Sequence, residues 1–156
     1  MIKEITVEPL VDHPSAVETI AGWFEAEWPA YYGLGGPGSA LRDVRAYANQ
    51  GGLPVGVVAL RSGSVCGIAA LKAQSISSYA DVSPWAAAGF VHPSLRGHGI
   101  GSLLLGALEE QACKLGFGRI WCGTSTAQSL LQRCGWQLRE TVIHEGENLG
   151  IFSKML

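Results

Sequence analysis

The segment Trp85–Leu115 constrains the fold of this chain more than any other part of its sequence. Its beginning, Trp85–Val91 (WAAAGFV), carries no polar side-chain group except the indole N–H, which is typical of a strand buried on both faces. After four residues comes the glycine-rich run Arg96–Gly101 (RGHGIG), and Gly99–Leu115 then repeats apolar residues at helical spacing. The sequence therefore predicts a buried strand, a tight turn and a helix that glycines open.

Hydrophobic periodicity and turn residues place the other elements around this segment. The predicted strands are Ile2–Val7, Leu53–Leu60, Val65–Ala73, Trp85–Val91, Gly118–Cys122, Gln137–His144 and Leu149–Met155. The predicted helices are one with a capping box at Ser15 and Glu18 that ends near Pro29, then Ala40–Gln50, Gly99–Leu115 and Thr124–Cys134. The inward face of the third helix is predicted to be Leu103, Leu104, Ala107, Leu108, Ala112 and Leu115, and Tyr31–Ser39 is predicted to be an irregular loop.

The order of these elements is β-α-α-β-β-β-α-β-α-β-β, which predicts a single α/β domain over residues 1–156, with helices on the faces of a mixed sheet. Hydrophobic residues make up 47% of the chain and charged residues 15%, so nearly all of it is expected to fold. The net charge of −2 and the lack of a Lys/Arg run argue against a nucleic-acid partner. No membrane span or secretion signal is recognisable, so a cytoplasmic protein is expected.

The four cysteines are Cys66, Cys113, Cys122 and Cys134. They lie far apart in apolar segments, with no CxxC pair and no histidine at metal-ligand spacing. We therefore expect reduced core residues and no metal site.

The glycine-rich run is the candidate site of chemistry. A helix N-terminus exposes unpaired backbone N–H groups and the positive end of the helix dipole, so glycines there can hold a phosphate. Arg96 would add a charge-assisted contact. Neither the dinucleotide fingerprint GxGxxG nor the Walker A loop is met, because Ser102 stands where the third glycine would be and no lysine precedes it. The alternative is that these glycines only form a tight turn.

Two motifs resemble those of the GNAT superfamily of N-acetyltransferases. The run from Val91 through Pro93 to Gly101 resembles that superfamily's acetyl-CoA signature, (Q/R)xxGxG/A after a V-x-P strand end. The stretch Ala127–Trp136 resembles its second motif, A-x-x-[LF]-Y-x-x-x-G-F. The resemblance implies a mostly antiparallel sheet of six to seven strands with about four helices, and a cleft where the fourth and fifth strands splay apart.

The resemblance also implies which residues bind acetyl-CoA, with no metal. Backbone groups of Phe90 and Val91 would pair with the pantetheine arm, and Gly89 suits the bulge usually found in that strand. Thr124 would take the place of an asparagine that hydrogen-bonds the same arm. The phosphate-binding residues would be Arg96, Gly97, His98, Gly99, Ile100, Gly101 and Ser102.

The implied reaction is attack of a neutral amine on the thioester, which requires a base, an oxyanion donor and an acid. The oxyanion donor would be a backbone N–H near Val91. The usual acid is a tyrosine, but Leu131 occupies its position. Ser129 and Ser125 are the alternative acids, and the other interpretation of each is an ordinary helix or capping serine.

The strand Trp85–Val91 contains no carboxylate, so the base is sought nearby. The candidates are Asp81, His92 and Glu27. The alternative is that none of them is catalytic: Asp81 would then cap a turn, His92 would have a structural role in the loop, and Glu27 would be an exposed helix residue. The acceptor amine is expected to meet the aromatic residues Trp28, Tyr31 and Tyr32.

The leading interpretation is thus an acetyl-CoA-dependent N-acetyltransferase that acts on a primary amine of a small molecule or peptide. A non-catalytic acyl-CoA-binding sensor and a purely structural domain are the alternatives. The sequence leaves open the acceptor, the acyl group and whether the chain is a monomer or a homodimer.

Overall fold

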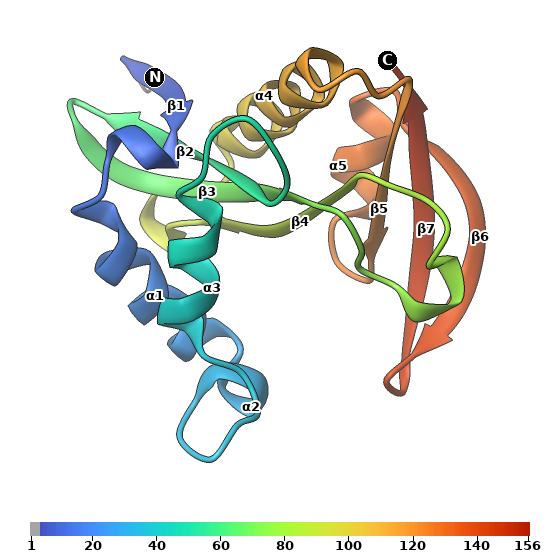
Figure 1. Cartoon of the computed structure of the whole chain (residues 1–156), viewed down its shortest axis with the longest axis horizontal. Coiled ribbons are helices and arrows are strands. Elements are labelled where there is room, and N and C mark those ends of the chain that lie inside the picture. The colour runs from blue at the N-terminus through green and yellow to red at the C-terminus, as the bar shows by residue number, and fades with distance from the viewer. Residues whose placement is uncertain (1–3) are drawn as a thin grey trace.

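The computed structural model describes residues 4–156, and within them seven strands form one open sheet in the order β1-β2-β3-β4-β5-β7-β6 (Figure 1). The strands are β1 (Ile5–Pro9), β2 (Val55–Arg61), β3 (Ser64–Lys72), β4 (Trp85–Val91), β5 (Arg119–Thr124), β6 (Gln137–His144) and β7 (Glu147–Met155). Neighbouring strands are antiparallel except β4 and β5, which are parallel. The predicted mixed, mostly antiparallel sheet is confirmed.

Helices cover both faces of this sheet. They are α1 (Ala16–Glu27), α2 (Pro29–Tyr32), α3 (Ala40–Tyr47), α4 (Ile100–Lys114) and α5 (Gln128–Arg133). Figure 1 shows α1–α3 gathered on one side and α4 on the other. Within residues 4–156 no helix has the length and apolarity that crossing a bilayer requires.

The strands β2 and β3 contain apolar runs because helices cover both faces of the sheet there. In β2, Val57 and Ala59 pack in the cluster that contains the α4 residues, while Val58 and Leu60 pack with α1 and α3. Successive residues of a strand point to opposite faces, so a strand covered on both sides is apolar at every position.

The strands β4 and β5 diverge, and this divergence creates the cleft described below. Their register contains the single pair Trp85 and Trp121, and the remainder of β4 runs away from β5 (Figure 1). The prediction that Trp85–Val91 is buried on both faces is therefore wrong from Ala87 to Gly89, whereas Phe90 is buried. Trp85 and Ala86 are buried, whereas Gly89 is exposed, because no strand covers the β5 side there.

A bulge in β4 increases this divergence. Between the pairs Ile68–Phe90 and Ala70–Ala87 the register shifts, so that Ala88 and Gly89 together face one residue of β3. The bulge anticipated from Gly89 is present, but the residue in the left-handed conformation is Ala88, with φ of 56°. A non-glycine residue held there carries strain, which is often found at functional sites.

Several predicted boundaries shift. The described part of the first strand begins at Ile5, and residues 2 and 3 of the prediction lie outside the described residues. The loop predicted for Tyr31–Ser39 starts with the helical turn α2, and the second helix ends at Tyr47 instead of Gln50. The predicted helix Thr124–Cys134 shortens to α5, because Thr124 still belongs to β5 and pairs with Gly150 of β7.

Three side-chain predictions are wrong. The Ser15 hydroxyl makes no capping hydrogen bond, since its backbone is already helical. Leu103 is 47% exposed because it turns away from the buried face of α4. Cys113, on the same helix, is exposed, whereas Cys66 is buried as expected and Cys122 and Cys134 are half-buried.

Candidate functional site

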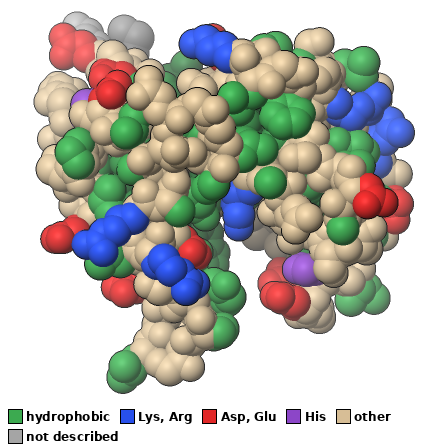
Figure 2. All heavy atoms as spheres, in the orientation of Figure 1, with side chains coloured by type: hydrophobic (Ala, Val, Ile, Leu, Met, Phe, Trp, Pro, Cys, Tyr) green, Lys and Arg blue, Asp and Glu red, His purple; other side chains and the backbone are tan. Residues whose placement is uncertain are grey.

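A cleft of about 920 Å³ lies where β4 and β5 diverge. Its size is near the upper end of the range of about 300–1,000 Å³ that ligand pockets occupy. Its walls come from β4, the turn before α4, the first turns of α4, the end of β5 and α5. Figure 2 shows the hollow between the half of the molecule with α1–α3 and the half with β5–β7.

The glycine-rich turn lines this cleft. Gly97 and Gly99 both have φ of 82°, in the left-handed region that favours glycine. A Cβ at either position would meet nothing within 4 Å, so the backbone conformation and not crowding requires glycine there. Helix α4 begins after Gly99 without a side-chain cap, which leaves its first N–H groups available to an anion.

Gly101 is required for a different reason. A Cβ built on it would lie 3.1 Å from Cδ2 of Leu130, closer than most real contacts. The lack of a side chain thus lets α5 pack against the first turn of α4. The close packing of two helices is therefore a reason for glycine at position 101 that does not depend on a ligand.

The Arg96 side chain turns back over β4. Its Nε donates to the carbonyl of Val91 at 2.8 Å, and its guanidinium lies 5.3 Å from the centre of the Phe90 ring. One Nη is 4.0 Å from the Glu27 carboxylate. Arg96 therefore joins β4 to the end of α1 on the wall of the cleft.

Glu27 and Trp28 bring the end of α1 to the same wall. The Trp28 ring packs edge-on against Phe24 and Phe90, with ring centres 5.0 and 6.5 Å apart. Trp28 is thus both part of the core and part of the cleft. Of the three proposed bases, Glu27 is the one that lines it.

The opposite wall carries hydroxyl groups and a carboxylate. The Thr124 hydroxyl oxygen accepts from the N–H groups of Thr126 at 3.2 Å and Ala127 at 3.0 Å. Both of its lone pairs are then used, and its O–H remains to donate. The Ser125 hydroxyl donates to the Glu147 carboxylate at 3.1 Å, and both residues line the cleft.

Most of the predicted cofactor-binding residues line the cleft: Phe90, Val91, Arg96, Gly97, Gly99, Ile100, Gly101, Ser102 and Thr124. Several other candidate residues lie outside it. Ser129 and Asp81 are exposed outside it, and so is the side chain of His98. The Nδ1 of His92 lies 2.7 Å from the Ser94 hydroxyl, where His92 caps the turn after β4.

The two candidate tyrosines also lie outside the lining. The Tyr32 hydroxyl donates to Asp43 of α3 at 2.7 Å. Burial, together with this hydrogen bond, raises the pKa of Tyr32. Tyr31 packs edge-on against Tyr32 and is 48% exposed. These rings stand beside the aromatic wall of Trp28 and do not form the described cleft.

Among the cleft residues that were missing from the predicted site, three carry chemical groups that bear on its function: Arg133, Glu147 and Cys122. Arg133 follows Leu130 by three residues, a helical spacing that places both on one face and that the sequence already contained. Glu147 reaches the cleft only because the β6–β7 hairpin folds back, which no local pattern specifies. Cys122 was expected in the core, and burial raises the pKa of its thiol to about 12.

Among residues 4–156 no group of three or more His, Cys, Asp or Glu side chains is arranged to hold a metal ion. The polar groups of the cleft are instead backbone N–H groups, hydroxyls, two arginines and two carboxylates. Such a site suits an anionic ligand at the glycine turn and a cationic one near the carboxylates.

Comparisons with known proteins agree with this geometry. The model of the acetyltransferase (GNAT) family matches residues 18–136. No curated protein matches the sequence significantly. An aminoglycoside 6'-N-acetyltransferase complexed with coenzyme A has a similar fold, with a TM-score of 0.77, 14% identity and 96% of each chain covered.

Two further solved structures are similar. The aminoglycoside 6'-N-acetyltransferase from Enterococcus faecium has a TM-score of 0.76 at 15% identity, with 96% of each chain covered. An acetyltransferase from Streptococcus pneumoniae has a TM-score of 0.70 at 17% identity, covering 98% of this chain and all of the other. At these identities the likeness concerns the fold.

Proposed function

Because the chain belongs to the GNAT family of acetyltransferases, we propose that it transfers the acetyl group of acetyl-CoA to a primary amine of a small molecule. The observation that carries this proposal is the cleft at the divergence of β4 and β5, which reaches the glycine turn Gly97–Gly99. Aminoglycoside acetyltransferases among the similar structures favour a small-molecule acceptor over a peptide.

The cleft residues fit coenzyme A. The left-handed glycines and the uncapped start of α4 suit a pyrophosphate. The edge of β4 beyond Trp85 is not paired with β5, so its backbone groups can pair with the amides of a pantetheine arm. The Thr124 O–H can donate to the same arm.

Acetyl-CoA supplies an activated acyl group as a thioester. The carbonyl of Val91 points to the cleft edge, where Arg96 binds it, and the N–H of a strand residue points to the same edge as its carbonyl. The Val91 N–H can therefore stabilise negative charge that develops on the thioester oxygen.

The acceptor amine attacks as a neutral group, so its ammonium proton must leave first. Glu27 and Glu147 are the carboxylates that line the cleft, and either can bind the ammonium and pass its proton to water. The C–N bond forms as the C–S bond breaks, and the sulfur then takes a proton. We propose that Ser125, and not Ser129, passes this proton to the sulfur, because Ser125 lines the cleft and Ser129 does not. The Ser125 hydroxyl regains a proton from Glu147, to which it is hydrogen-bonded, when Glu147 has taken the proton of the ammonium, or otherwise from water.

Direct attack is favoured over a covalent acyl-cysteine. Cys122 lines the cleft, but its raised pKa of about 12 keeps it a neutral thiol near pH 7. A thiolate is the nucleophilic form of cysteine. Cys122 is therefore a poor nucleophile at physiological pH.

The test is release of free thiol from acetyl-CoA in the presence of aminoglycosides, polyamines, aromatic amines and peptides. Turnover on small amines with none on peptides is the expected result. Tight binding of acetyl-CoA without turnover on any acceptor would favour the non-catalytic sensor, which the replacement of the usual tyrosine by Leu131 makes a real alternative. Absence of acetyl-CoA binding would refute both.

A further inference from the structure

The phosphates of coenzyme A require compensation of their negative charge. The backbone N–H groups of the glycine turn carry only partial charges. Among the described residues that line the cleft, the basic side chains are Arg96 and Arg133. A side chain of the cleft that gives the phosphates a full positive charge must therefore be Arg96 or Arg133.

Arg96 is already engaged. Its Nε donates to the Val91 carbonyl, its central guanidinium carbon lies over the Phe90 ring and Glu27 is within 4.0 Å. These contacts direct its charge to the β4 and α1 wall. The residue that the sequence signature indicated is therefore less available to a phosphate than the spacing predicted.

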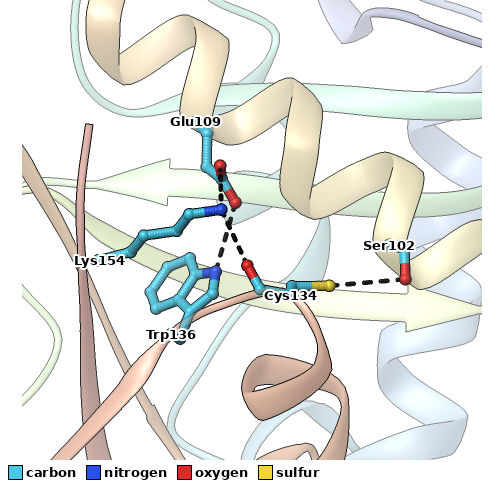
Figure 3. Close-up of polar contacts among 5 residues, drawn as sticks. All are labelled: Ser102, Glu109, Cys134, Trp136 and Lys154. Carbon is cyan, nitrogen blue, oxygen red and sulfur yellow. Dashed lines mark hydrogen bonds and ion pairs between the residues drawn. The ribbon is translucent and has the colours of Figure 1, made fainter.

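Arg133 lines the cleft from the end of α5, the helix that packs against the first turn of α4. It is the last residue of α5, and its neighbour Cys134 places Sγ 3.6 Å from the hydroxyl of Ser102 in the first turn of α4 (Figure 3). Leu130, one turn earlier in α5, packs against Gly101. Two contacts thus hold the end of α5 against the N-terminus of α4.

The Arg133 side chain is also accessible. It is exposed, and no carboxylate within residues 4–156 lies within 4.0 Å of it. A guanidinium matches phosphate oxygens with two parallel hydrogen bonds. Arg133 therefore combines the position, the charge and the geometry that a phosphate contact needs.

We propose that Arg133 binds a phosphate group of coenzyme A and so completes the anion site that the glycine turn begins. This inference rests on the proposed binding of coenzyme A. The phosphate can be the pyrophosphate or the 3'-phosphate, which offer the same chemistry to a guanidinium.

The experiment measures the Kd of coenzyme A and of 3'-dephospho-coenzyme A by calorimetry. The proteins are wild type, Arg133→Gln, Arg133→Lys and the control Arg45→Gln, which removes an equal charge from an exposed position of α3 outside the cleft. We expect Arg133→Gln to weaken coenzyme A binding about tenfold, as loss of one charge-assisted contact does. Arg133→Lys should recover part of this loss, and Arg45→Gln should bind like wild type.

The two ligands identify the phosphate. If the loss disappears with 3'-dephospho-coenzyme A, Arg133 binds the 3'-phosphate, and if it persists, Arg133 binds the pyrophosphate. For a charge contact the loss must also shrink at high salt. Equal affinity of Arg133→Gln and wild type for coenzyme A, or an equal loss in Arg45→Gln, would overturn the inference. Failure of wild type itself to bind coenzyme A would instead reject the proposed function.

Discussion

The carboxylate of Glu109 on α4 lies 2.9 Å from the ammonium of Lys154 on β7 (Figure 3). Its other oxygen accepts from the indole N–H of Trp136 at 3.3 Å, and Lys154 also donates to the carbonyl of Cys134 at 2.8 Å. Because β4 and β5 share one register pair, these contacts tie the C-terminal strands to the helix that covers the other half of the sheet. They hold together the two sides of the cleft.

Replacement of Glu109 by Gln is expected to lower the free energy of unfolding by about 1–3 kcal/mol, the usual cost of losing a hydrogen bond to a partly buried charged group. The Glu109 side chain is only 20% exposed, which limits screening by solvent. Denaturant titration measures the change. Glu110→Gln, at the exposed next position of α4, is the control and should unfold like wild type. Equal stability of both variants would contradict a role for Glu109 in joining the halves.

The phosphate site at the start of α4 can be tested without backbone strain. Substitutions at Gly99 force a side chain into φ of 82°, and those at Gly101 press on Leu130. Ser102→Asp avoids both problems, since Ser102 is an exposed residue of the first helical turn. A carboxylate there stabilises a helix by about 0.3–1 kcal/mol, yet it repels a bound phosphate.

We therefore expect Ser102→Asp to keep or raise the melting temperature while weakening coenzyme A binding at least about tenfold. Ser102→Ala separates loss of the hydroxyl from gain of the charge. Calorimetry and thermal unfolding of the same samples provide both readouts. Coenzyme A binding by the aspartate variant at the strength of the alanine variant would reject the anion site.

Two serines that the sequence left as alternatives can be distinguished by position. Ser125 lines the cleft and donates to Glu147, whereas Ser129 is exposed outside the lining. Ser125→Ala is expected to reduce kcat by about tenfold or more, because proton transfer to the leaving sulfur loses its donor. Ser129→Ala should retain the wild-type rate. Steady-state thiol release with any accepted amine measures both, and an unchanged kcat in Ser125→Ala would remove Ser125 as the proton donor.

Alkylation should report the different states of the cysteines. The thiolate is the reactive form, so a raised pKa lowers reactivity at a given pH. Burial raises the pKa of Cys122 to about 12, so its thiol stays almost entirely neutral at pH 8. Exposed Cys113 is expected to react first with iodoacetamide, and Cys122 only as the pH approaches 12 or the chain unfolds. Peptide mass analysis identifies the site, and early modification of Cys122 at pH 8 would reopen the acyl-cysteine route.

The order of the main elements and the phosphate turn were predictable because their signals are local. Glycine at positions 97 and 99 reflects a backbone conformation that other residues rarely adopt, and the strand before and the helix after it have distinct periods. Two boundaries were less predictable: the short helix α2 extends to Tyr32, and α5 begins after Thr124 instead of at it. Thr124 stays in β5 because it pairs with Gly150, a residue far along the chain.

By itself, the sequence determined the turn at Gly97–Gly101 and the helix that follows it, since both depend on neighbouring residues. The tertiary structure alone decided which side chains converge on that turn. The divergence of β4 from β5 opened the cleft, the packing of α5 on Gly101 brought Arg133 beside it, and the β6–β7 hairpin carried Glu147 to Ser125. These contacts join residues distant in sequence, and their geometry follows from sheet register and helix packing, which no local pattern contains.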